Sequence, residues 1–239
     1  MPYGNNDYGK DSRESAYTAI PASYETDGRT ARVKTGTGPA AWGHDGTQGG
    51  VWDLNGNIWE WQGGIRLVWG ELQILENNNA ADPANSQVSS STSWKAIKAS
   101  DGTLVEPECS TSDSAATLTG NTVKLDYTDG SWVWTTAVTS SLDQTRNCDF
   151  GSISASEEVG AAAKTLLRIL ALLPEDGAGA SDYDGDSVWL NNAKAEVCIY
   201  RGGRWSYGTG AGVFSLACNP RASLSNAIGF RSVYIPESE

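Results

Sequence analysis

Only one stretch of this 239-residue chain has the apolar spacing of an α-helix, so the fold must be built mainly from strands and loops. That stretch is residues 156–176. Ser154 or Ser156 can cap it, Glu157 and Glu158 favour its first turn, and Pro174 marks its end. We expect this helix to cover a sheet. Apolar residues recur through it at helical spacing: Val159, Ala162, Leu166, Ile169 and Leu173.

Residues 122–136 predict a β-hairpin. Apolar and polar side chains alternate over 123–127, and Trp132 and Trp134 share one face of the following segment. Asp129-Gly130 between them is a favoured pair for a two-residue turn. The alternation indicates a hairpin that is buried on one side.

Residues 50–61 gather three tryptophans, Trp52, Trp59 and Trp61, around Asn55-Gly56. This Asn-Gly pair favours a type I′ turn, because both central residues need positive φ. We therefore expect a second hairpin here, followed by another strand over 65–75. Buried under a sheet, the tryptophans would form part of the core.

Length and composition indicate one globular domain, 1–239, with extended loops over 1–49 and a loop-and-hairpin insertion over 77–150. The net charge of −12 and the pI of about 4.5 disfavour nucleic acid and anionic membranes as partners. No apolar stretch reads as a signal peptide or a membrane span, so no membrane insertion is expected.

Few residues have the pattern of a catalytic or metal site. The four cysteines form no CxxC pair and His44 is the single histidine, which disfavours zinc and Ser-His-Asp chemistry. Residues 182–186 resemble part of a calcium loop, but a solvated acidic turn explains them better. His44 is expected to have a polar surface or turn role.

Asp53 and Glu60 flank the Asn55-Gly56 turn. With the carbonyls of the turn they could provide the hard oxygen ligands that calcium prefers. Alternatively, they satisfy buried backbone donors or an arginine such as Arg231.

Two segments together carry a family resemblance. "LNGNIWEW" resembles the Trp-Glu-Trp signature of the formylglycine-generating sulfatase-modifying family, and "RGGRW" with the later "IGFR" resembles its C-terminal block. The resemblance implies a variant of the C-type lectin fold: α+β, with a small twisted antiparallel sheet, few helices and long loops. Family members usually have more chain before "PYGNN", so an incomplete N-terminus is expected.

Residues 201–231 are most similar to the variable region of proteins diversified by diversity-generating retroelements, in particular those of phages and prophages. Such systems change AAY codons to NNY codons, which cannot encode Lys, Glu, Gln, Met or Trp, and residues 206–227 contain none of these. The resemblance implies a scaffold of Gly202, Gly203, Trp205, Val213, Phe214, Ile228 and Phe230. It implies ligand-binding positions at Arg204, Ser206, Tyr207, Ser215, Ala217, Cys218, Asn219, Ser223, Leu224, Asn226 and Ala227.

The resemblance also bears on cofactors. It implies calcium at Asp53 and Glu60, with backbone oxygens of Gly56 and Ile58. The oxidases of the family bind copper through a cysteine pair, and Tyr207 and Gly212 stand near those positions here, so neither copper nor catalysis is expected. An oxidase with an altered active site is the alternative, and a structural virion protein is a third interpretation.

The function implied is therefore recognition through a diversified surface. The expected setting is a phage tail or an extracellular surface, the expected partner a bacterial surface protein or glycan. A homotrimer would suit a tail fibre.

Overall fold

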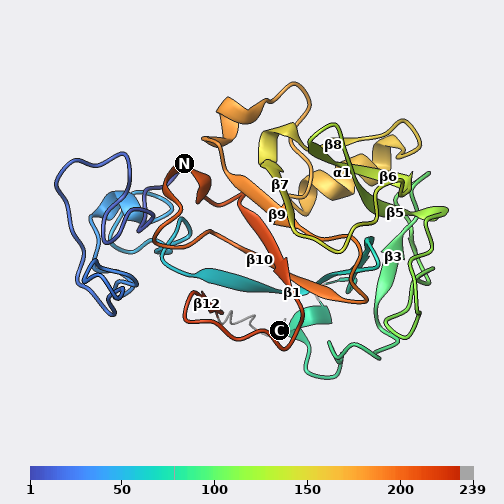
Figure 1. Ribbon diagram of the computed structural model, residues 1–239, viewed down its shortest axis with the longest axis horizontal. Coiled ribbons are helices and arrows are strands. Elements are labelled where there is room, and N and C mark those ends of the chain that lie inside the picture. The colour runs from blue at the N-terminus through green and yellow to red at the C-terminus, as the bar shows by residue number, and fades with distance from the viewer. Residues whose placement is uncertain (78, 232–239) are drawn as a thin grey trace, which may run out of the picture.

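The computed structural model describes residues 1–77 and 79–231 and centres on one curled sheet (Figure 1). The described residues form one α-helix, α1 (Ala161–Ile169), and twelve strands. The strand order is β7-β9-β11-β10-β1-β2-β5-β6-β8, with β12 beside β1, and β3 and β4 beside β2. The α+β expectation holds at this coarse level. The expected small antiparallel sheet is corrected, because three strand pairs (β9–β11, β1–β12 and β6–β8) are parallel.

The strands are β1 (Trp59–Val68), β2 (Glu71–Ile74), β3 (Lys95–Ile97), β4 (Leu104–Val105), β5 (Thr119–Thr128), β6 (Ser131–Ala137), β7 (Arg146–Asp149), β8 (Ser154–Ala155), β9 (Ser187–Leu190), β10 (Val197–Arg201), β11 (Leu216–Asn219) and β12 (Ile228–Gly229). Short 3-10 turns are η1 (Ala40–Trp42), η2 (Asn79–Ala81), η3 (Phe150–Ser152), η4 (Ala180–Tyr183) and η5 (Gly208–Gly210).

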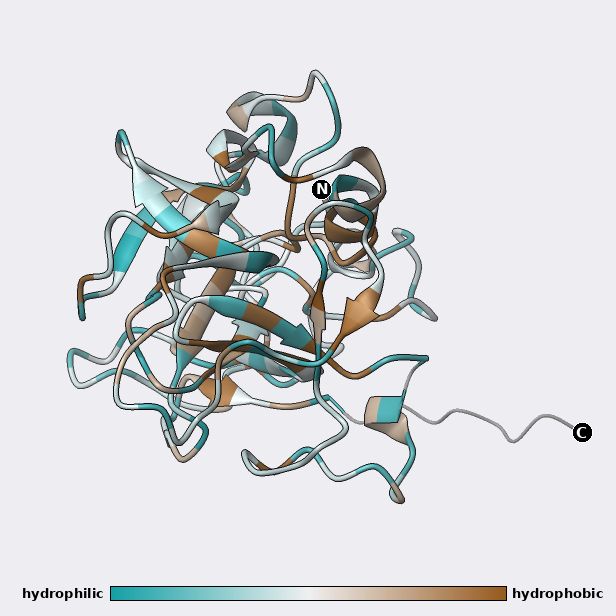
Figure 2. Ribbon diagram, turned by 90° about the vertical axis from the view of Figure 1, so that its right-hand side faces the viewer, coloured by the Kyte–Doolittle hydropathy of each residue, from teal (hydrophilic) through white to brown (hydrophobic). Residues whose placement is uncertain are grey.

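Alternation along the strands gives the sheet two different faces. The inner face forms the main core, which includes Ile199 of β10 and Leu216 of β11 together with Trp132, Trp134 and Leu167. Figure 2 shows hydrophilic and hydrophobic residues alternating along the strands, as expected of a sheet with two different faces. No helix within the described ranges has the length and apolarity needed to cross a bilayer.

The hairpin at Asp129-Gly130 is confirmed. β5 pairs with β6, and these two residues have φ of 51° and 82°. Its polar side is nevertheless buried, with Lys124 fully covered. The prediction of a hairpin at Asn55-Gly56 is wrong, since the chain before this pair forms only an isolated bridge at Trp52. The tight turn of this region is instead Trp69-Gly70, between β1 and β2.

The predicted helix is shorter than expected, and a different face of it is buried. Ser154 lies in β8, and α1 begins after Gly160, where a Cβ would lie 2.2 Å from the Ser100 carbonyl oxygen. Leu167 is buried on α1, whereas Ile169 is 75% exposed. Close packing of Gly160 against this carbonyl delays the start of the helix.

The first 58 residues form a loop-rich lobe at one end of the molecule (blue to cyan in Figure 1). This N-terminal lobe has its own small core around Trp42 and Trp52. The predicted insertion, in contrast, contributes to the main sheet through β5 and β6, while its loops cover the outer face of β1 and β2. Backbone N–H groups of Glu108 and Cys109 donate there to the buried Glu71 carboxylate.

Candidate ligand-binding face

Five aromatic rings lie in contact on the outer face of β9, β11, β10 and β1. We call this group the aromatic face; it consists of Trp59, Trp61, Trp189, Tyr200 and Tyr207. The centroid of Trp59 lies 5.9 Å from Trp189, 5.0 Å from Tyr200 and 5.6 Å from Tyr207. Trp61 contacts Tyr200 at 5.0 Å, and Trp189 contacts Tyr207 at 5.0 Å. Most of these pairs are edge-to-face, the geometry that aromatic quadrupoles favour.

The aromatic face is part core and part surface. Trp59 is 3% exposed and lies at its centre, whereas Trp61, Trp189 and Tyr207 are only partly buried. The Asn219 amide donates to the Tyr200 hydroxyl at 2.9 Å, and burial raises the pKa of Tyr200. The guanidinium carbon of Arg204 lies 4.9 Å from the Tyr207 ring centroid. Partly exposed aromatic rings thus lie beside amide and guanidinium groups on this side of the sheet.

Several of the residues predicted from the variable region gather around this face. Tyr207 belongs to it, and Ala217 and Asn219 lie on the same side of β11. The loop after β11 carries Leu224, which is 98% exposed, and returns to the aromatic face through Ile228. Asn226 is exposed in that loop, and Ser206 and Ser223 are partly exposed.

Four predicted positions are corrected. Ala217 is 4% exposed and packs in one buried cluster with Trp59 and Tyr200. Cys218 is 6% exposed and points into the main core, because it alternates with Ala217 and Asn219 along β11. Ser215 is fully buried, its hydroxyl donating to the Gly210 carbonyl at 2.7 Å. Ala227 packs with Trp205 and Ala31 in a separate cluster.

The scaffold residues of this region were predicted better. Trp205 is buried, and Gly202 and Gly203 have positive φ, as expected of a pair that bends a strand. Phe230 is the exception, at 78% exposure. Trp189 and Tyr200 were missed. Each points away from the main core, in a strand whose neighbouring residues point into it.

The predicted calcium ligands lie together only in part. Asp53 and Glu60 both line a cavity of about 180 Å³. Asp53 is 4% exposed, and neither of its carboxylate oxygens has a hydrogen-bond partner among the residues described. Thr35 and the Gly36 backbone lie nearby without hydrogen-bonding geometry, and burial raises the pKa of Asp53 to about 6.

Glu60, however, is paired within the protein. Arg231 donates to both of its carboxylate oxygens, from Nη2 at 2.7 Å and from Nε at 3.0 Å, and also to the Trp52 carbonyl at 2.9 Å. Gly56 N–H donates to the Gly202 carbonyl at 2.7 Å, and Ile58 packs partly against Trp205. The arginine alternative thus holds for Glu60, and the implied four-ligand calcium site does not fit while Arg231 occupies this carboxylate.

Other chemistry-bearing residues lie apart from the aromatic face. His44 is exposed, and its Nδ1 accepts the Val51 N–H at 2.8 Å, which confirms the turn role. All four cysteines are unpaired and buried. Across residues 1–77 and 79–231, no three His, Cys, Asp or Glu side chains gather as a metal site would require.

Comparison of the sequence with protein-family models gives no match, and comparison with curated proteins gives none either. The assignment of a function therefore depends on the geometry above and on the resemblance of the two sequence segments.

Proposed function

We propose that this protein recognises a ligand through the aromatic face and the adjoining β11–β12 loop, on a C-type lectin-like scaffold. The observation that carries the proposal is the position of Tyr207 and Asn219. They come from the segment that resembles a diversified region, and they lie on one side of the sheet beside partly exposed tryptophans.

The two faces of the sheet support a separation of stability from recognition. Side chains of β10 and β11 that point inward belong to the main core, and each large buried side chain there contributes about 2 to 3 kcal/mol. Substitution of a partly exposed residue such as Asn219 changes stability far less. The recognition surface can therefore vary while the scaffold is retained.

The proposed partner is a component of a bacterial surface, protein or glycan, and the proposed setting is a phage tail or an extracellular surface. Partly exposed indole and phenol rings provide apolar contact area, and Arg204 and Asn219 provide hydrogen-bond donors beside them. Catalysis is not part of this proposal.

The binding test uses purified protein against a panel of bacterial cells and isolated surface glycans. Tyr207→Ala and Asn219→Ala are expected to lower affinity at least about tenfold for any bound strain, since they remove contacts from the aromatic face. Tyr24→Ala is the matched control, because Tyr24 is 64% exposed in the N-terminal lobe. Equal binding by all variants, or no selective binding, would contradict the proposal.

The diversification claim has a separate test in genomic sequence. A near-copy of the region encoding residues 204–231, differing mainly at adenines, should lie near a reverse transcriptase gene. Its absence would remove the claim of diversification but not the binding face.

A further inference from the structure

The acidic segment 182–186 is only in part the solvated turn that its sequence suggests, since Asp182 and Asp184 are exposed but Asp186 is not. Asp182 accepts the Gly179 N–H at 2.8 Å, and Asp184 ends η4 with φ of 53°. Asp186, the next acidic residue, is only 1% exposed and lies directly before β9. One residue of this segment is therefore deeply buried although its charge needs compensation.

The Asp186 carboxylate is compensated on one side only. Its Oδ2 accepts the Phe214 N–H at 2.8 Å. Its Oδ1 has no hydrogen-bond partner in the part of the chain that the structure describes. The carboxylate packs against Gly212, where a Cβ would lie 1.9 Å from Oδ1, so only glycine leaves room for it.

A small cavity of about 20 Å³ lies beside this carboxylate. That volume holds one water molecule or one ion. Oxygen-bearing side chains line it together with Arg13: Asp184, Asp186, Asn6, Asn55, Ser12 and Thr209. Carboxylate, amide and hydroxyl oxygens are the ligands of hard cations.

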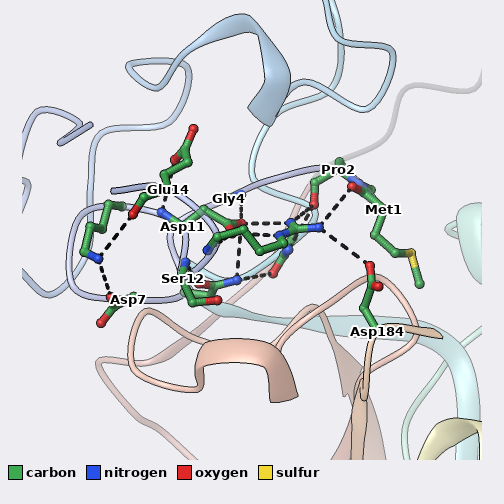
Figure 3. Close-up of polar contacts among 12 residues, drawn as sticks. Met1, Pro2, Gly4, Asp7, Asp11, Ser12, Glu14 and Asp184 are labelled. Atoms are coloured by element: carbon green, nitrogen blue, oxygen red, sulfur yellow. Dashed lines mark hydrogen bonds and ion pairs between the residues drawn. The ribbon is translucent and has the colours of Figure 1, made fainter. Parts of the chain in front are cut away.

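The charges around the cavity do not balance. Arg13 lies at its edge, but the guanidinium makes its closest contacts with Asp11, at 2.8 Å and 2.9 Å. Asp184 lies farther from it, at 3.6 Å, and Figure 3 shows this side chain pointing toward the N-terminal segment. The Arg13 guanidinium and the Met1 amino group thus face three carboxylates, so one negative charge stays uncompensated, and burial raises the pKa of Asp186 to about 7.

We propose that Asp184 and Asp186 bind one hard cation of the calcium class in this cavity, together with neighbouring amide and hydroxyl oxygens. This site is separate from the Asp53–Glu60 cavity, and it does not depend on the proposed function. With two carboxylates rather than three or four, its expected dissociation constant for Ca²⁺ is about 10⁻⁴ to 10⁻³ M.

A cation here would join two parts of the molecule. Asn6 and Asn55 belong to the N-terminal lobe, whereas Thr209 lies in η5, directly after Tyr207. The Gly208 N–H already donates to the Asn6 carbonyl at 2.9 Å. Binding would add stability to the loop that carries Tyr207, because the ion contacts the folded state only.

The test is Ca²⁺ titration of the full chain by calorimetry, with terbium luminescence as a second readout. The wild type is expected to bind one ion per chain at the Asp184–Asp186 site. Asp186→Asn and Asp184→Asn should each weaken that binding at least tenfold. Asp184 is half exposed, so its substitution tests the ligand role without disturbing the fold. Asp182→Asn is the matched control from the same segment, and it should bind as the wild type does.

Two outcomes would overturn the site. One is the absence of any binding at millimolar Ca²⁺. The other is binding that Asp186→Asn leaves intact while Asp53→Asn abolishes it, which would place the ion at the other buried carboxylate.

Discussion

At the scale of single residues, Arg231 links the C-terminal end of the described chain to the tryptophan-rich segment. Its guanidinium pairs with Glu60 in two hydrogen bonds and also holds the Trp52 carbonyl. Glu60 lies beside Asp53, whose carboxylate has no such partner within the described ranges. An internal cation thus neutralises one of two neighbouring carboxylates.

Replacing Arg231 tests this arrangement. Arg231→Gln is expected to lower the free energy of unfolding by about 1 to 3 kcal/mol, because it leaves Glu60 without a counter-charge. It should also allow Ca²⁺ to raise the melting temperature more than in the wild type, because Glu60 becomes available beside Asp53. The control is Arg231→Gln combined with Asp53→Asn, in which that additional rise should be lost. A variant that melts like the wild type, with or without Ca²⁺, would refute the pairing.

A buried ionic cluster lies on the outer face of β2 and β5. Lys124 is completely covered and donates to Glu108 at 2.6 Å and to Thr122 at 2.7 Å. Burial opposes ionisation of Glu108, but its bonds from Lys124, the Asn121 N–H and Thr122 outweigh burial and lower the pKa to about 2. The folded state therefore holds Glu108 ionised at pH values where the unfolded chain binds a proton.

The pH dependence follows from this difference. The stability from Glu108 is fully present above its ordinary pKa, 4.5, and should be lost as pH falls from there toward about 2. Glu108→Gln should lower the free energy of unfolding by about 3 kcal/mol at neutral pH, as measured by urea unfolding. It should also make that free energy fall less between pH 4.5 and about 2 than it does in the wild type. Glu106→Gln is the control from the same loop, since its exposed pair with Lys95 is worth little. If the free energy of unfolding depends on pH in the same way in Glu108→Gln and in the wild type, this account is disproved.

At the scale of elements, the end of β10 joins three parts of the fold. Arg201 donates to the Leu170 and Ala171 carbonyls at the end of α1, at 2.8 Å and 3.0 Å. Gly202 and Gly203 then turn the chain with φ of 96° and 80°. At Gly203 a Cβ would lie 2.4 Å from the Ala211 Cβ, so this glycine is needed both for its φ and for close packing.

A pair of glycine substitutions separates these two effects. Gly177 has the same φ of 80°, but a Cβ there would contact nothing within 4 Å. Gly177→Ala should cost about 1 kcal/mol from backbone strain alone, whereas Gly203→Ala should cost about 3 kcal/mol or more. Thermal unfolding of the two variants provides the comparison, and equal costs would show that the contact with Ala211 relaxes freely.

Elements with a local signal could be predicted from sequence, and those set by distant contacts could not. Asp129-Gly130 was identified correctly because its strands alternate on both sides. Asn55-Gly56 has an equally good turn pair, but the Asn5 carbonyl accepts the Asn57 N–H at 2.6 Å, so a segment fifty residues away takes the place of a hairpin strand. The helix start was misplaced for a similar reason, since Gly160 packs on Ser100.

At the scale of the whole molecule, a few buried amides hold the segments of the N-terminal lobe together. The Asn57 side chain accepts the Val33 N–H at 2.9 Å and an N–H of the Asn5 amide at 3.2 Å, and it donates to the Val33 carbonyl at 3.3 Å. Its own φ is 60°, a conformation that Asn tolerates better than most residues. The lobe has few regular strands to stabilise it independently.

Asn57→Ala is expected to loosen this lobe selectively. Hydrogen exchange should accelerate over residues 5–33, because three buried hydrogen bonds are lost, while β1, β2 and β10 keep their protection. Mass spectrometry of the exchanged peptides measures both regions in one experiment, so the sheet serves as the internal control. Uniform acceleration across the chain would instead indicate global destabilisation.

The candidate site was predicted in outline but not residue by residue. Sequence resemblance singled out the segment 201–231, in which Tyr207 belongs to the aromatic face and Asn219 donates to the Tyr200 hydroxyl of that face. In the segment "SLACN" polar and apolar residues do not alternate, so nothing in it showed that Cys218 faces the core. Trp189 lies outside that segment and joins the site only because β9 pairs with β11.

The inward and outward alternation of β11 also constrains inheritance. If a retroelement rewrites this stretch, gene copies should differ at the codon for residue 219, whose side chain is partly exposed, and agree at those for 216 and 218, whose side chains lie in the main core. Mutations at residues 216 and 218 would cause misfolding and be lost. A count of sequence variants among gene copies should therefore be lowest at these two positions.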